Sequence, residues 1–242
     1  MTKPQIYFET DNWATRKYAP IRPANEYIPK KFSSIAAFVD KRPHRIDSVK
    51  TVRACPGISE YFGLGYVIPA WCDIEINPTP NGIQARYSDP TFHHAVHSPE
   101  QIENFMEKTF KVRSPVKLDN PWRTYTAKGW SVLYLPMLYH EEQNWQAMPG
   151  IIDHDIGALQ SPINIMLKEQ KPTLIRQGDP LCQVIPIQRN DVVARTGDIR
   201  ASTELRNKSI IQSMFMSFKG WAGLMREHKR YKVDAHDTDL PE

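Results

Sequence analysis

The chain has 242 residues, of which 40% are hydrophobic and 24% are charged. This length fits one large domain or two small ones, and the composition excludes an intrinsically disordered chain. A formal net charge of +4 permits contact with nucleic acid but does not favour it, because the 31 lysines and arginines are spread along the sequence.

Short elements joined by prolines are predicted for the N-terminal part. The alternation of apolar and polar residues over 5–9 is typical of a strand. An extended, proline-spaced segment follows, and apolar residues about three apart then predict a short amphipathic helix over 32–38. Residues 41–45 form a basic connector. With 20 prolines against 11 glycines, the chain favours a β-rich structure over a helical bundle.

The next block of the sequence is dense in apolar residues. A short helix is expected over 55–62, where glycines end it. Residues 66–76 predict a long strand that is broken by Pro69. The segment 77–82 ends in Asn-Gly, which predicts a hairpin turn into a returning strand over 83–87.

A histidine-bearing loop is expected over 89–99, and a helix is expected from Ser98 to about Lys108. Ser98 is a suitable N-cap, and a proline at the next position fits the first helical turn. The core sheet is predicted in the middle third as short strands separated by polar turns: 130–135, 161–167, 172–176 and 180–187.

The pattern becomes helical from Ser202 to about Tyr231. The predicted fold class is α+β, with a β-rich core (a sandwich or a clip-like barrel), short N-terminal elements and a long C-terminal helix. We expect a β-rich domain over 1–195, and the helix with a loose acidic tail over 196–242. One apolar stripe follows the helix: Leu205, Ile211, Met214, Phe218, Trp221 and Met225.

Three cysteines, Cys55, Cys72 and Cys182, are far apart in the sequence, and each lies in an apolar run. The odd count and the absence of a C-x-x-C pair predict buried free thiols in a reducing compartment. The N-terminal residues do not resemble a signal peptide, and no apolar run approaches the ~20 residues that span a bilayer. We therefore expect no membrane partner.

Two carboxylates, Asp153 and Asp155, lie in a glycine-bounded turn over 150–157. Because alternate residues of a strand point to opposite faces, only one of these carboxylates is expected to face a given pocket. A second tight turn, at Gly178 and Asp179, lies between two of the predicted strands.

These two turns, with the strands around them, resemble the end of the dUTPase and dCTP-deaminase type of β domain. The resemblance covers roughly a quarter of the chain. It implies that Asp153 occupies the place of a water-activating aspartate. It also implies that Gly178, Asp179 and Gln183 occupy the place of a phosphate-side turn.

The chain departs from the pattern of that family in three places. Ile156 stands where the family has a substrate-stacking tyrosine, and residues 135–139 contain no counterpart of its phosphate-holding Pro-Arg-Ser motif. A predicted helix replaces its glycine-rich C-terminal flap. These departures disfavour dUTPase catalysis and leave a dUTPase-like β architecture as the expectation.

A further set of motifs occurs in a fixed order over 27–190: Tyr27-Ile28-Pro29-Lys30, Cys55-Pro56, Gly65-Tyr66-Val67-Ile68-Pro69, Asn120-Pro121-Trp122, Lys128-Gly129-Trp130-Ser131 and Gly178-Asp179-Pro180-Leu181-Cys182. In these motifs the chain resembles an uncharacterised family of tailed-phage and bacterial proteins. That family has no assigned activity. The resemblance implies a phage context, in the cytoplasm of the host cell or in the virion, and no mechanism.

Several histidines lie beside carboxylates, as at His140 and His154, and three more lie over 93–97. Imidazole and carboxylate groups suit zinc or iron, but no complete metal-binding motif is present. We favour histidines without a metal, and the sequence does not identify a cofactor.

Tryptophans and arginines supply the remaining candidates for binding. Trp122 and Trp145 lie in polar loops, which makes them the best candidates for recognition contacts. Arg123 and Arg176 are the cations expected to join Asp153 if a catalytic pocket exists. Backbone amides near Gly178 would then bind anionic groups.

Two classes of function remain open. The favoured one is a phage-associated binding or structural protein that acts through a protein surface, as a homo-oligomer or with other phage proteins. The resemblance to clip-type β domains, which often assemble as trimers, supports an oligomer. The alternative is an enzyme that acts on a nucleotide or other small polar substrate, with Asp153 as the base.

Overall fold

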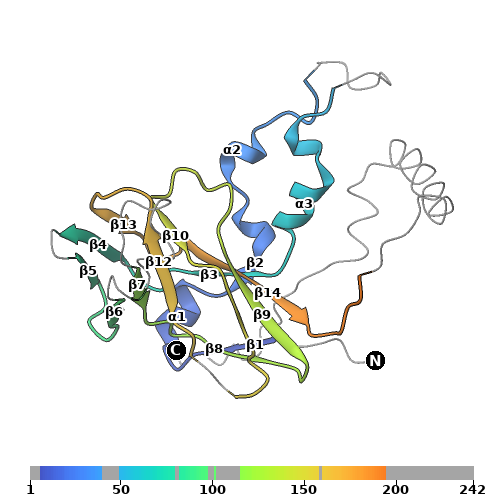
Figure 1. Ribbon diagram of the computed structural model, residues 1–242. Coiled ribbons are helices and arrows are strands. Elements are labelled where there is room, and N and C mark those ends of the chain that lie inside the picture. Colours follow the sequence, from blue (N-terminus) through green and yellow to red (C-terminus); the bar gives the residue numbers. More distant parts are fainter. Residues whose placement is uncertain are drawn as a thin grey trace.

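The computed structural model describes residues 6–39, 49–79, 82–97, 101, 115–157 and 160–194. Within these residues the protein is β-rich, with four antiparallel sheets and only short helices (Figure 1). None of the four sheets closes on itself in this part of the chain, so the described region is not a closed barrel. It likewise contains no helix that is long and apolar enough to cross a membrane.

The largest sheet has five strands, and its centre is the pairing of β9 with β14. Seven residue pairs join these two strands, from Cys182 opposite Pro136 to Gln188 opposite Trp130. The order across the sheet is β11 (Gly150–Ile152), β9 (Trp130–Pro136), β14 (Pro180–Gln188), β3 (Tyr66–Pro69) and β2 (Arg22–Pro23).

Three smaller sheets surround this one. The four-stranded sheet has the order β10 (Trp145–Ala147), β12 (Ile163–Leu167), β7 (Val116–Leu118) and β6 (His94–Val96). The three-stranded sheet has the order β13 (Thr173–Ile175), β4 (Ile74–Thr79) and β5 (Gly82–Tyr87). The two-stranded sheet pairs β1 (Ile6–Glu9) with β8 (Arg123–Thr126).

The helices are short and belong to the N-terminal part: α1 (Trp13–Tyr18), α2 (Lys30–Ser33), α3 (Pro56–Phe62) and the 3-10 turns at Ala24–Tyr27 and Val52–Ala54. Helix α1 begins because the side chain of Asn12 accepts a hydrogen bond from the Thr15 amide, as an N-cap does. Helices α2 and α3 lie together at one end of the molecule, where the rings of Phe32 and Phe62 are 4.8 Å apart (Figure 1).

The two faces of the five-stranded sheet have different surroundings. On one face, side chains such as those of Val132 and Val184 belong to the apolar core shared with the other sheets. The side chains that alternate with these along the strands lie on the opposite face, which we call the outer face. They include Leu133, Ile151 and Ile187. Ile151 is 60% exposed there.

The C-terminal end of α3 covers one part of the outer face. The buried side chain of Gln183 donates hydrogen bonds to the carbonyls of Tyr61 and Leu64, at 3.2 and 2.6 Å. Gly65 has φ +74°, and a Cβ built on it would lie 2.2 Å from the carbonyl oxygen of Val184. Only glycine therefore lets the loop after α3 lie this close to β14.

All four strands predicted for the core sheet are present, but they lie in three different sheets, so the single core sheet is wrong. The strands expected over 130–135, 161–167, 172–176 and 180–187 are β9, β12, β13 and β14. The turn at 150–157 and the strand at 180–187 belong to one sheet, as expected, because β9 pairs with both β11 and β14.

Other expectations are wrong. The break predicted at Pro69 in the strand over 66–76 is confirmed, since β3 ends there, but β3 and β4 lie in different sheets and do not form one long strand. Residues 70–73 between them instead contact the turn at 177–179, where Ala70 exchanges backbone hydrogen bonds with Gly178 and Asp179. Of the three cysteines, which are all free, Cys72 and Cys182 are buried but Cys55 is exposed at the start of α3.

Three expected elements lie outside the described residues. These are the basic connector over 41–45, the helix from Ser98 to about Lys108, and the C-terminal helix over 202–231 with its acidic tail. They stay predictions, as does the division of the chain at residue 195.

Gly65 gives the first prediction. The variant Gly65→Ala should lower the free energy of unfolding by about 3 kcal/mol or more, because left-handed backbone strain is added to a backbone clash. Gly129→Ala is the matched control, since Gly129 has φ +82° but open space at the Cβ position. It should cost only about 1–2 kcal/mol. Equal losses in urea unfolding would contradict the close approach of the loop to β14.

Candidate functional site

Asp153 takes part in a charged cluster at the end of β11. The guanidinium of Arg189 lies 3.0 Å from Oδ1 of Asp153 and also contacts Oδ2 of Asp155. The Ser131 hydroxyl donates to Asp153 Oδ1 at 2.6 Å, and the Gly129 amide donates to Asp155 Oδ2 at 2.7 Å. We call Ser131, Asp153, Asp155 and Arg189 the clasp, because they join β9, the turn after β11 and the end of β14.

Arg189 and Asp155 shift each other's pKa. The hydrogen bond from Arg189, followed by that from the Gly129 amide, lowers the pKa of Asp155. The same contact with Asp155 raises the pKa of Arg189. The side chain of Asp155 is only 4% exposed, whereas the side chain of Asp153 is 44% exposed. Asp155 is therefore the inner carboxylate of the clasp.

The expectation that Asp153 and Asp155 face opposite sides is wrong. Strand β11 ends at Ile152, and the two aspartates lie in the turn that follows, where the alternation of a strand does not apply. One arginine can therefore bind both carboxylates.

The turn at 176–179 has its backbone amides occupied by other groups of the chain. Asp179 accepts from the Arg176 amide at 2.8 Å, and Asp73 accepts from the Gln177 amide at 2.8 Å. The Gly178 amide donates to the Ala70 carbonyl, and the Asp179 amide donates to the Arg176 carbonyl. The amides that the phosphate-binding hypothesis requires already have intramolecular acceptors.

The other predicted binding residues do not converge on Asp153. Trp122 and Trp145 are 5% and 9% exposed, so they lie in the core and not on a recognition surface as expected. Both tryptophans have polar neighbours in the sequence, so their burial could not be predicted from those neighbours. Arg123 is exposed on β8 and lies 3.4 Å from Asp11. Arg176 is exposed in the turn described above, and Gln183 is buried under α3.

Two of the histidines are buried structural groups. His154 is 1% exposed, and its Nε2 lies 2.8 Å from the hydroxyl of Tyr134. His140 is 8% exposed, and its Nε2 donates to the Tyr27 carbonyl at 3.0 Å. Burial lowers the pKa of both imidazoles, which favours their neutral forms.

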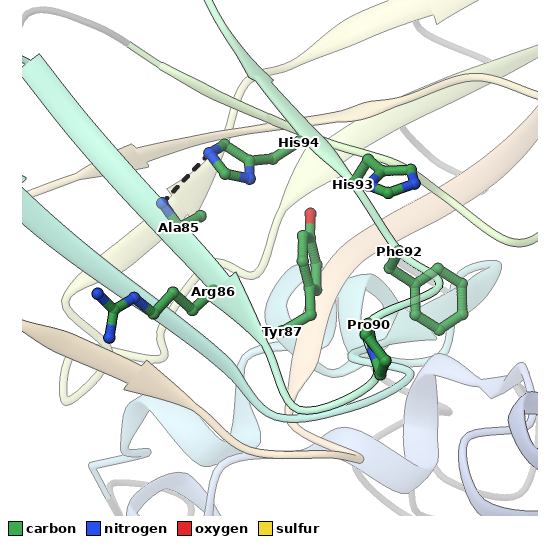
Figure 2. Close-up of a pocket in the computed structure, with 7 residues that line it drawn as sticks. All are labelled: Ala85, Arg86, Tyr87, Pro90, Phe92, His93 and His94. Atoms are coloured by element: carbon green, nitrogen blue, oxygen red, sulfur yellow. Dashed lines mark hydrogen bonds between the residues drawn. The ribbon is translucent and has the colours of Figure 1, made fainter.

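His93 and His94 line a shallow depression of about 450 Å³ beside β5, with Ala85, Arg86, Tyr87, Pro90 and Phe92 (Figure 2). The Ala85 amide donates to His94 Nε2 at 3.4 Å, as the dashed line in Figure 2 marks. Asp153, Arg123 and Arg176 are not among the lining residues. The described residues also contain no group of three or more histidines, cysteines and carboxylates that could hold a metal ion.

Helix α1 presents an aromatic surface that the sequence analysis did not single out. Trp13 and Tyr18 are 57% and 53% exposed, and their ring centroids are 6.1 Å apart. The ammonium group of Lys17 lies 6.0 and 5.3 Å from the two ring centroids. Tyr18 is three residues after the buried Thr15, which places both on the same side of the helix, so the exposure of Tyr18 could not be predicted from the spacing. We call Trp13, Lys17 and Tyr18 the α1 surface.

Comparison with known proteins gives only distant similarity. No protein-family model and no curated protein matches the chain. Among solved structures, the dUTPase of EIAV is 9% identical, with a TM-score of 0.35 and coverage of 81% of this chain and 98% of its own. A mutant dUTPase from phage phi11 of S. aureus is 11% identical, with a TM-score of 0.36 and coverage of 80% and 97%. At this level neither similarity carries an argument about the site.

The clasp gives the second prediction. Asp155→Asn should lower the urea midpoint of unfolding at pH 7, because a neutral amide replaces the inner carboxylate that binds Arg189. Asp153→Asn should lower the midpoint less, because the Asp153 side chain is 44% exposed.

The effect of Asp155→Asn has a defined pH dependence. The folded pKa of Asp155 lies below its ordinary value of 3.8. Its contribution to stability is therefore fully present above pH 3.8 and is lost as the pH falls through the lowered folded pKa. The midpoints of the wild type and Asp155→Asn should converge in acid, and a difference that stays constant with pH would contradict this account.

Proposed function

We propose that this chain is a phage-associated binding or structural protein that acts through a protein surface as a homo-oligomer. The α1 surface is the part of the described chain that we assign to this role. The single observation that carries the assignment is the pair of neighbouring exposed aromatic rings, Trp13 and Tyr18, on one short helix. The phage context rests on the motif resemblance over 27–190.

The chemistry of the α1 surface supports protein binding. Tryptophan and tyrosine are the residues most enriched among those that dominate binding energies at interfaces. The N-cap at Asn12 and the buried side chain of Thr15 fix the helix that presents them. Each aromatic side chain has only two rotatable bonds, so it loses little conformational entropy on binding, which favours tight association.

The described contacts of Asp153 disfavour the alternative enzyme. A general base must be free to accept a proton from a substrate or water. Asp153 Oδ1 instead accepts from Ser131 and lies beside the Arg189 guanidinium. The amides of the 176–179 turn, which would bind anionic groups in that mechanism, are already hydrogen-bonded.

Size-exclusion chromatography with light scattering tests the oligomer. If the β-rich region is a clip-like domain, a trimer is the expected assembly, with a mass of about 84 kDa for three 28.0 kDa chains. The oligomer of the double variant Trp13→Ala, Tyr18→Ala should dissociate at protein concentrations at least about 30-fold higher than those at which the wild-type oligomer dissociates. The reason is that each interface aromatic contributes about 2 kcal/mol or more.

The control is Leu174→Ala, which truncates an exposed apolar side chain on β13 and should leave the mass unchanged. A wild type that is monomeric at every concentration would refute the homo-oligomer. An oligomer that survives the double variant would refute the α1 surface as its interface.

A nucleotide hydrolysis screen tests the alternative function. We expect no turnover above background with either the wild type or Asp153→Asn, because Asp153 already has intramolecular partners. Turnover by the wild type that disappears in Asp153→Asn, with unfolding unchanged, would establish the enzyme and overturn the proposal.

A further inference from the structure

The outer face of the five-stranded sheet has an apolar part that no described residue fully covers. Leu133 on β9 lies opposite Ile151 on β11 and Ile185 on β14, so the three side chains form one row across three strands. The loop after α3 buries Ile185, which is 5% exposed. Ile151 at the other end of the row is 60% exposed, and Leu133 and Ile187 are half-buried. We call Leu133, Ile151 and Ile187 the open patch.

The chain leaves the sheet beside this patch. Strand β14 ends at Gln188, one residue after Ile187, and Arg189 turns into the clasp with Asp153 and Asp155. The clasp therefore fixes the point from which the rest of the chain continues. The described part ends at Ala194, after the exposed residues Val192 and Val193.

The continuation carries the apolar stripe that the sequence predicts over 202–231. We infer that this stripe packs on the open patch of its own chain. This inference is independent of the α1 surface and of the proposed function.

Dimensions support this assignment. The eight residue steps from Ala194 to Ser202 can reach up to about 28 Å when extended. A helix over 202–231 would be about 45 Å long and about 10 Å wide. Strands β11, β9 and β14 are neighbours, so two strand spacings, about 10 Å, separate Ile151 from the β14 positions. One helix would cover the open patch and bury its own apolar stripe in the same contact.

Limited trypsin digestion, followed by mass spectrometry, tests the contact in the full chain. Cleavage after Lys219 and Arg226, which flank Trp221 in the sequence, reports access to the stripe. Ile151→Asp should accelerate this cleavage about tenfold or more, since burial of one isoleucine is worth at least that factor in an equilibrium. Phe218→Asp, in the stripe itself, should do the same. The double variant Ile151→Asp, Phe218→Asp should be cleaved no faster than either single variant, because both changes break the same contact.

Leu174→Asp is the matched control. Leu174 is also the central residue of a three-residue edge strand and is 46% exposed, but it lies on β13 in another sheet. It should leave cleavage at Lys219 and Arg226 unchanged. Near-ultraviolet circular dichroism checks that each variant is folded. If Ile151→Asp does not fold, Phe218→Asp against Leu174→Asp still decides the question.

Two results would overturn the inference. The first is equal cleavage of the wild type, Phe218→Asp and Leu174→Asp, which would mean that the stripe has no protected site. The second is protection that decreases on dilution, together with a lower light-scattering mass for Ile151→Asp. That combination would assign the open patch to a second copy of the chain.

Discussion

The pairing of β9 with β14 is the constraint on which the rest of the structure depends. Its seven residue pairs decide which side chains enter the core and which lie on the outer face. A slip of β14 by one residue against β9 would move Val184 to the outer face and Gln183 into the core. The contact of Gln183 with the carbonyls after α3 would then be lost. So would the clasp, because Ser131 and Arg189 lie at the same end of this strand pair.

The sequence predicts those strands whose apolar pattern is long enough to be distinctive. β9 and β14 have seven and nine residues and were both expected. Strands β7 and β10 have three residues each and were missed, although β13 is equally short and was predicted. The placement of β3 and β4 in different sheets depends on contacts with residues about a hundred positions away. Asp73, for example, accepts from the amide of Gln177. A local pattern contains no information on such partners.

The same limit applies to the candidate site. The sequence indicates Asp153, Asp155, Gly178 and Asp179 as candidate residues, and all four lie in turns as expected. It did not identify Arg189, which is 34 residues from Asp155 and decides whether the two carboxylates are available. The exposure of two tryptophans was also predicted wrongly, because Trp122 and Trp145 have polar neighbours in the sequence and are nevertheless buried. Flanking residues report the polarity of a loop, whereas burial of a tryptophan depends on which sheets pack over it.

The polar groups that suggested chemistry therefore act in maintaining the shape of the protein. Asp153 and Asp155 hold the end of β14 through Arg189, and Asp73 and Asp179 order the turn before β14 through its amides. Both ends of the central strand are thus fixed by carboxylates of the chain itself. A carboxylate that must hold a strand end in place is poorly suited to exchange partners during catalysis, because each exchange would release that strand end. Trp13 and Tyr18 are exposed outside the strands that these carboxylates hold, so the binding role proposed for them is compatible with an intact sheet.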